Sequence, residues 1–94
     1  MLFKLRKDER GLLDALLRDD RASRLSIQYM EGAAIGEDPD CIYVLVEGPE
    51  DLLEAAKGIL GEGRILGGDE ADRVLSKMRE LEDRAAEGLG SIFG

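Results

Sequence analysis

The sequence contains no histidine, tryptophan, threonine or asparagine, and its only cysteine is Cys41. Without histidine the chain lacks the commonest general base and the commonest metal ligand. One cysteine cannot close an internal disulfide, and it is too little for an iron–sulfur cluster or a paired-cysteine metal site. We therefore expect no cofactor and no enzyme activity, and the nearest catalytic alternative is a cryptic enzyme that uses carboxylates.

Long apolar runs and positive charge are also scarce. The longest uninterrupted apolar run covers residues 42–46, whereas a membrane-spanning helix needs about 20 such residues. The formal net charge is −8, from 21 acidic and 13 basic residues, and this sign disfavours both nucleic acid and anionic lipid as partners. We expect a single cytoplasmic domain over residues 1–94, since a second core needs a longer chain. The scarcity of labile amides, with no asparagine and a single glutamine, fits a thermophilic protein or a biased genome equally.

Alternating and helical patterns follow one another in the first half of the chain. Within residues 1–6, Met1, Phe3 and Leu5 alternate with Lys4 and Arg6, which indicates a short strand, although Leu2 interrupts the pattern. Asp8 can cap a helix whose leucines recur with helical spacing to residue 17. Residues 25–30 alternate again, and residues 41–46 are apolar on both faces, as in a central strand.

The second half begins with Pro49, which together with two acidic residues is typical of a helix start, and Gly61 is typical of a helix end. Residues 64–66 are long enough for a short strand. Asp69 can cap a final helix, and Gly88 and Gly90 are expected to break it, leaving residues 88–94 as a flexible tail.

These segments predict an α+β fold with the order β-α-β-β-α-β and an added C-terminal helix. This order resembles the ferredoxin-like fold, a two-layer sandwich in which two helices cover one face of a four-stranded antiparallel sheet. The second face of the sheet would carry Leu2, Gln28, Met30, Tyr43 and Leu45. Because these residues are too apolar to face water, we expect either the last helix or a second copy to cover them, giving three layers in the first case.

Acidic clusters are the other notable feature. Most of them precede predicted helices, where capping and the helix dipole account for them. The cluster at residues 37–40 precedes a strand and caps nothing, and oxygen-rich loops of this kind suit Ca²⁺ or Mg²⁺. A solvated turn is the simpler alternative. The candidate metal ligands are Asp8, Glu9, Glu37, Asp38, Asp40 and Glu62.

The leading hypothesis is therefore a non-catalytic binding or assembly module that associates with a protein partner or with itself. A divalent-cation-binding protein is the alternative. The candidate interaction residues are apolar positions on the second sheet face and in the C-terminal tail, namely Met30, Tyr43, Leu45, Leu89, Ile92 and Phe93.

Overall fold

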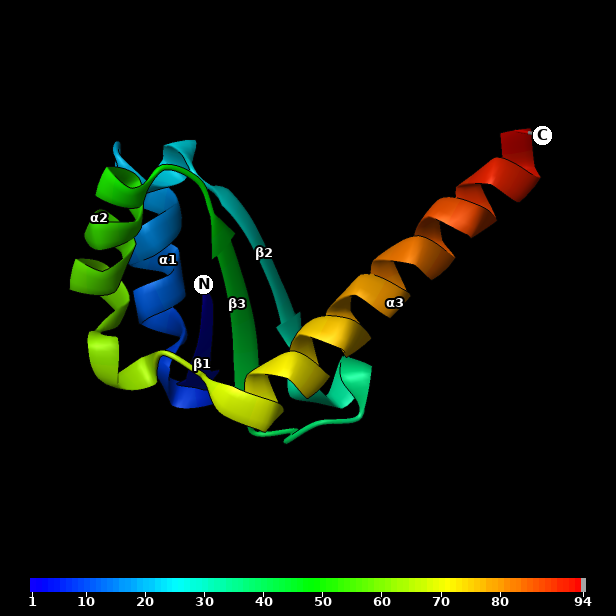
Figure 1. The fold of residues 1–94 in the computed structure, drawn as a ribbon, viewed down its shortest axis with the longest axis horizontal. Coiled ribbons are helices and arrows are strands. Elements are labelled where there is room, and N and C mark those ends of the chain that lie inside the picture. The colour runs from blue at the N-terminus through cyan, green and yellow to red at the C-terminus, as the bar shows by residue number, and fades with distance from the viewer. Residues whose placement is uncertain (94) are drawn as a thin grey trace.

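The computed structural model describes the backbone of residues 1–93 and the side chains of residues 1–83. Its chain order is strand, helix, strand, strand, helix, helix, with short 3₁₀ helices in the connections (Figure 1). The regular elements are β1 (Leu2–Arg6), α1 (Arg10–Arg18), β2 (Ser26–Glu31), β3 (Cys41–Glu47), α2 (Glu50–Leu60) and α3 (Gly68–Phe93). The 3₁₀ helices are η1 (Lys7–Glu9), η2 (Ala22–Arg24), η3 (Gly32–Ile35) and η4 (Glu62–Arg64).

The sheet has the strand order β1-β3-β2, and both strand pairs are antiparallel. The central strand is β3, in agreement with its continuous apolar sequence, and six of its seven residues are buried. Val44 lies opposite Phe3 on one side and Tyr29 on the other. An α+β fold is therefore confirmed.

One face of the sheet packs against α1 and α2. Phe3, Leu5, Val44 and Val46 project from the strands into this core, and Leu16 meets them from α1. All five are completely buried. The alternation within the strands and the helical spacing of the leucines thus place the apolar side chains as the sequence predicts.

The second face is covered by the N-terminal part of α3 and by η3. Tyr43 and Leu45 from β3 pack there with Val74 and Met78 from α3 and with Ile35 from η3. Of the two ways to cover this face, the structure therefore shows the last helix. Figure 1 shows α3 crossing beside one end of the sheet and continuing past β2.

Two predicted elements differ from the structure. The segment expected to form a fourth strand makes only a single bridge between Ile65 and Phe3, because its first residue, Arg64, belongs to η4. The four-stranded ferredoxin-like order is therefore not confirmed. Gly88 and Gly90 do not end α3, whose backbone continues to Phe93. Whether residues 88–94 are flexible stays a prediction.

The predicted cap of the first helix is also different. Asp8 lies within η1, so it does not cap α1. The neighbouring Glu9 turns back instead, and its carboxylate accepts a hydrogen bond from the Arg6 backbone N–H at 2.9 Å. Among the residues that the structure describes, no helix has the length and the apolar character needed to cross a membrane.

Candidate functional site

The two edges of the sheet differ in how they are protected. The edge at β1 is partly covered by the chain before α3, through the Ile65 bridge and a hydrogen bond of 2.8 Å from the Leu66 N–H to the Leu2 carbonyl. In the part of the chain that the structure describes, β2 pairs only with β3. An open strand edge presents unpaired backbone N–H and C=O groups, which can pair with another polypeptide.

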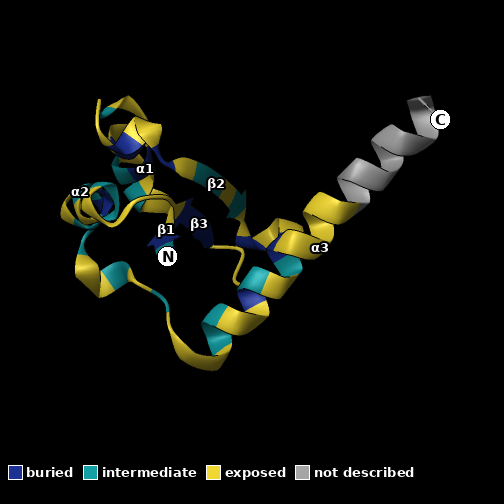
Figure 2. Ribbon diagram, turned by 45° about the horizontal axis from the view of Figure 1, so that its top comes forward, coloured by how far each residue is buried: buried dark blue, intermediate teal, exposed yellow. Residues whose placement is uncertain are grey.

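A groove of about 370 Å³ runs beside this open edge, between β2 and α3. We call it the edge groove. Tyr29 is 46% exposed at the edge, and Leu81 is 36% exposed where α3 leaves the sheet. The lining residues are Ile27, Gln28, Tyr29, Met30, Leu81 and Glu82. In Figure 2 the ribbon of β2 is coloured mostly as exposed and half-buried, whereas the ribbon of β3 is coloured as buried.

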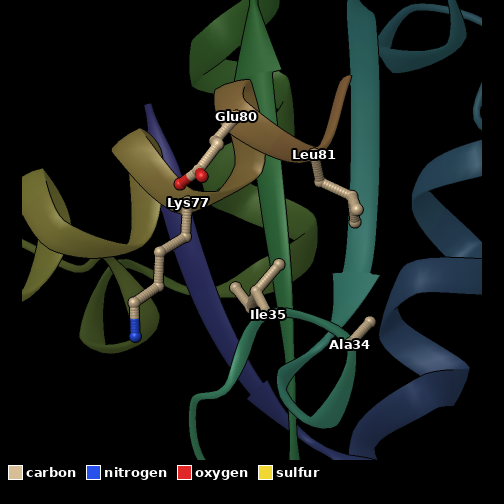
Figure 3. A pocket seen from close by; sticks show the side chains of 5 residues that line it. All are labelled: Ala34, Ile35, Lys77, Glu80 and Leu81. Carbon is tan, nitrogen blue, oxygen red and sulfur yellow. The ribbon is translucent and has the colours of Figure 1, made fainter. Parts of the chain in front are cut away.

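A smaller hollow of about 230 Å³ also uses Leu81, but it is formed by η3 and α3. Figure 3 shows Ala34 and Ile35 below the helix and Lys77, Glu80 and Leu81 along it. Leu81 therefore contributes to both hollows, so the position of α3 decides the shape of each.

Three charged residues fix α3 against the loop after η3. The Arg73 guanidinium donates two hydrogen bonds to the Glu37 carboxylate, at 2.8 and 2.9 Å, and Lys77 Nζ donates a third at 2.6 Å. The Glu37 side chain is only 8% exposed. We call these three residues the α3 clamp. The two hydrogen bonds from Arg73, followed by the one from Lys77, lower the pKa of Glu37 to about 2.

We expect Glu37→Gln to loosen α3 and to lower the thermal midpoint by several degrees. Because the folded-state pKa of Glu37 lies below its unfolded value, the carboxylate stabilises the fold above about pH 4.5, and this contribution disappears as the pH falls toward 2. The difference in thermal midpoint between Glu37→Gln and the wild type should therefore be largest at neutral pH and should decrease as the pH falls. Thermal unfolding followed by circular dichroism from pH 7 to pH 2.5 measures it.

Asp14→Asn is the matched control for this variant, since it removes one negative charge at an exposed position of α1. It should change the midpoint little at any of these pH values. An equal loss of stability in both variants would show that net charge, and not the α3 clamp, accounts for the effect.

The six predicted metal ligands do not form one cluster. Glu37 belongs to the α3 clamp, and Glu9 is bound by the Arg64 guanidinium. That ion pair and the Arg6 N–H lower the pKa of Glu9 to about 2. Within residues 1–83 no group of three or more acidic or thiol side chains is arranged to hold a metal ion. Cation binding stays a prediction. In this structure the carboxylates of Glu9 and Glu37 are already bound by basic side chains.

Asp8, Asp38, Asp40 and Glu62 are exposed. Asp8 and Asp40 lie together at a shallow hollow of about 200 Å³ that also contains Arg6 and Lys7. Asp38 accepts a hydrogen bond of 2.9 Å from the Asp40 N–H, which orders the turn before β3. This hydrogen bond supports the alternative interpretation of residues 37–40 as a solvated turn.

The predicted interaction residues are also separated. Tyr43 is completely buried and Leu45 is nearly so, both beneath α3. The Tyr43 hydroxyl is buried without a hydrogen-bond partner among the described residues. Met30 is half-buried and lines the edge groove. The side chains of Leu89, Ile92 and Phe93 lie outside the described residues.

Cys41 is buried at the start of β3. Burial, with a smaller contribution from the nearby Asp38 carboxylate, raises the pKa of its thiol. A raised pKa keeps the thiol protonated at neutral pH and makes it a poor nucleophile.

No known protein family, curated protein or solved structure matches this chain. The candidate site therefore rests on the geometry of the edge groove. Sequence reasoning did not name Ile27 and Tyr29 as candidate interaction residues, yet both line the groove, and Ile27 also packs against the α1/α2 core. One available signal was the uncharged run at residues 25–30, in a chain of which 36% is charged.

Proposed function

We propose that this chain is a non-catalytic binding and assembly module that holds another polypeptide strand along the edge groove. The observation that carries the proposal is the open edge of β2, which lies beside an apolar groove of about 370 Å³. Strand addition at such an edge combines main-chain hydrogen bonds, which supply affinity, with side-chain pockets, which supply specificity.

The chemistry of the available side chains supports a binding role over a catalytic one. The thiol of Cys41 is buried and its pKa is raised. The two carboxylates with strongly lowered pKa values, Glu9 and Glu37, are held by basic residues. A carboxylate in such an ion pair stays ionised and is a weak general base.

We also interpret the fold as a ferredoxin-like arrangement whose fourth strand is reduced to the bridge at Ile65. The strand order β1-β3-β2 and the two helices on one face support this interpretation. In a complete fold of this kind a fourth strand would lie beside β1, and β2 would still be an edge. The reduction therefore leaves the candidate site unaffected.

A peptide library tests the proposal. The wild-type protein, immobilised at low density so that copies do not meet, is panned with displayed random peptides. We expect enrichment of peptides with alternating apolar side chains, and we expect Tyr29→Lys to weaken their binding at least tenfold, because a lysine replaces the most exposed apolar side chain of the groove. Titration of synthetic peptides by fluorescence anisotropy measures the affinities.

Ile65→Lys is the matched control, since Ile65 is also partly exposed, at 38%, but lies at the opposite edge of the sheet. It should leave peptide binding unchanged. No enrichment, or equal binding to Tyr29→Lys and the wild type, would contradict a polypeptide site at the edge groove.

A further inference from the structure

We propose that the edge groove is occupied by β2 of a second copy of this chain, paired antiparallel about a twofold axis that passes through Gln28. This inference rests on the proposed function and specifies its partner. The resulting dimer has one continuous six-stranded sheet, with α1 and α2 of both copies on the same face.

The first argument is that β2 lacks the protection that edge strands normally carry. Monomeric proteins place lysine, proline or a bulge on an exposed edge, or cover it, so that it does not pair with another copy. Residues 26–30 contain no charge and no proline, and they pair with β3 without a bulge. The partly covered edge at β1 carries Lys4 and Arg6. By composition, β2 resembles an interior strand.

The second argument is that β2 is complementary to itself. Ile27 and Tyr29 lie opposite Val46 and Val44, which project toward α1 and α2, so both belong to that face. In antiparallel pairing centred on Gln28, Ile27 of each copy lies opposite Tyr29 of the other. An aromatic residue beside a β-branched residue is a favourable cross-strand pair. On the other face Ser26 lies opposite Met30.

Other registers are less favourable. A shift by one residue would place side chains of opposite faces against each other, which antiparallel pairing does not allow. A pairing centred on Tyr29 would place Glu31 of one copy against Ile27 of the other, and a charged side chain would then face an apolar one. Centring on Gln28 places Glu31, the last residue of β2, opposite Leu25, which precedes the strand, so the pairs formed by residues 26–30 contain no charge.

The third argument concerns charge and size. Each copy has a net charge of −8, so association brings like charges together. Added salt screens this repulsion and should strengthen the dimer, whereas it would weaken the binding of a basic partner. A single strand pair buries less than the roughly 800 Å² per partner of a standard interface. We therefore expect a reversible dimer with a dissociation constant in the micromolar range.

Cysteine cross-linking tests the register. Cys41→Ala provides a background without cysteine, and Gln28→Cys then places one thiol on the twofold axis, where two opposed residues of an antiparallel pair come close enough for a disulfide. Ile65→Cys in the same background is the control at the opposite edge. Under mild oxidation we expect Gln28→Cys to form covalent dimers at least tenfold faster than Ile65→Cys, and faster still at higher salt. Circular dichroism confirms that each variant is folded.

Equal cross-linking rates for the two variants would overturn the inference, as would a monomer at millimolar concentration in analytical ultracentrifugation of the wild type. Tyr29→Lys added to the Gln28→Cys chain should reduce the cross-linking rate to that of the control. If library peptides bind in a Tyr29-dependent way but the Gln28→Cys chains do not cross-link, the edge groove is a docking site for other proteins and the second copy is excluded. If cross-linking succeeds and no peptide binds, the edge is specific for its own copy.

Discussion

Phe3→Ala is expected to remove a large part of the free energy of unfolding, about 3–5 kcal/mol. The ring of Phe3 is completely buried between the sheet and α1 and α2. Truncation of a buried phenylalanine costs about 3–5 kcal/mol, whereas a domain of this length has a total stability of roughly 5–14 kcal/mol. Phe3 also lies beside both β3 and the bridge to Ile65, so its loss weakens both edges of β1.

Urea denaturation followed by circular dichroism measures this effect. The matched control is Ile65→Ala, because Ile65 is the bridge partner of Phe3 but is 38% exposed. It should cost about 1 kcal/mol or less. A loss of less than about 1.5 kcal/mol for Phe3→Ala, with an unchanged slope against urea, would contradict the central role of this side chain.

The central strand and the first core follow from patterns that are local in the sequence. Residues 42–46 are apolar without interruption, and such a run is stable only when both of its faces are covered. The structure covers one face with α1 and α2 and the other with α3. Gly61 also ends α2 as expected, with a backbone φ of 92° that favours glycine.

The reduction of the predicted fourth strand to a single bridge could not be foreseen from the sequence, because it depends on a contact between residues that are far apart in the chain. Arg64 is held by Glu9, which lies 55 residues earlier, and its guanidinium also donates a hydrogen bond to the carbonyl of Leu60. These bonds stabilise η4, so only Ile65 and Leu66 remain before Gly67 and the start of α3 at Gly68. Two residues are too few for a strand ladder.

The candidate site also depends on ion pairs between residues that are far apart in the sequence. The sequence shows an acidic loop at residues 37–40, but the partners of Glu37 are 36 and 40 residues away in α3. When Arg73 and Lys77 are not considered, the loop looks like a cation-binding site. The structure instead uses Glu37 of this loop as the acceptor of the α3 clamp. The edge groove exists only because α3 lies beside β2 at Leu81. Periodicity predicts the helix, whereas long-range ion pairs fix its position.

Gly32→Ala is expected to disrupt this positioning and to be the most destabilising single-methyl addition among the described glycines. A Cβ at residue 32 would lie 1.8 Å from the carbonyl oxygen of Asp38 and 2.7 Å from its carbonyl carbon, so the backbone itself has to move. The same loop is closed by a hydrogen bond of 2.8 Å from the Glu37 N–H to the Gly32 carbonyl. We expect a loss of about 3 kcal/mol, at the upper end of the usual cost of overpacking.

Gly11→Ala provides the opposite control. A Cβ at residue 11, in α1, would meet no atom within 4 Å, and alanine is favoured over glycine in a helix by about 0.5–1 kcal/mol. This variant should therefore be more stable than the wild type in the same urea titration. Equal stability of Gly32→Ala and the wild type would show that the loop can relax around a methyl group.

Hydrogen exchange separates the local consequence of Gly32→Ala from its global cost. Displacement of Asp38 also moves Glu37, and the α3 clamp then loses its acceptor while the sheet and the α1/α2 core stay intact. Amides of α3 should therefore exchange faster in Gly32→Ala than amides of β3, relative to the wild type. A uniform increase across both elements would mean that α3 and the sheet unfold as one unit. In that case the clamp contributes to global stability, and the edge groove would open only when the whole domain unfolds.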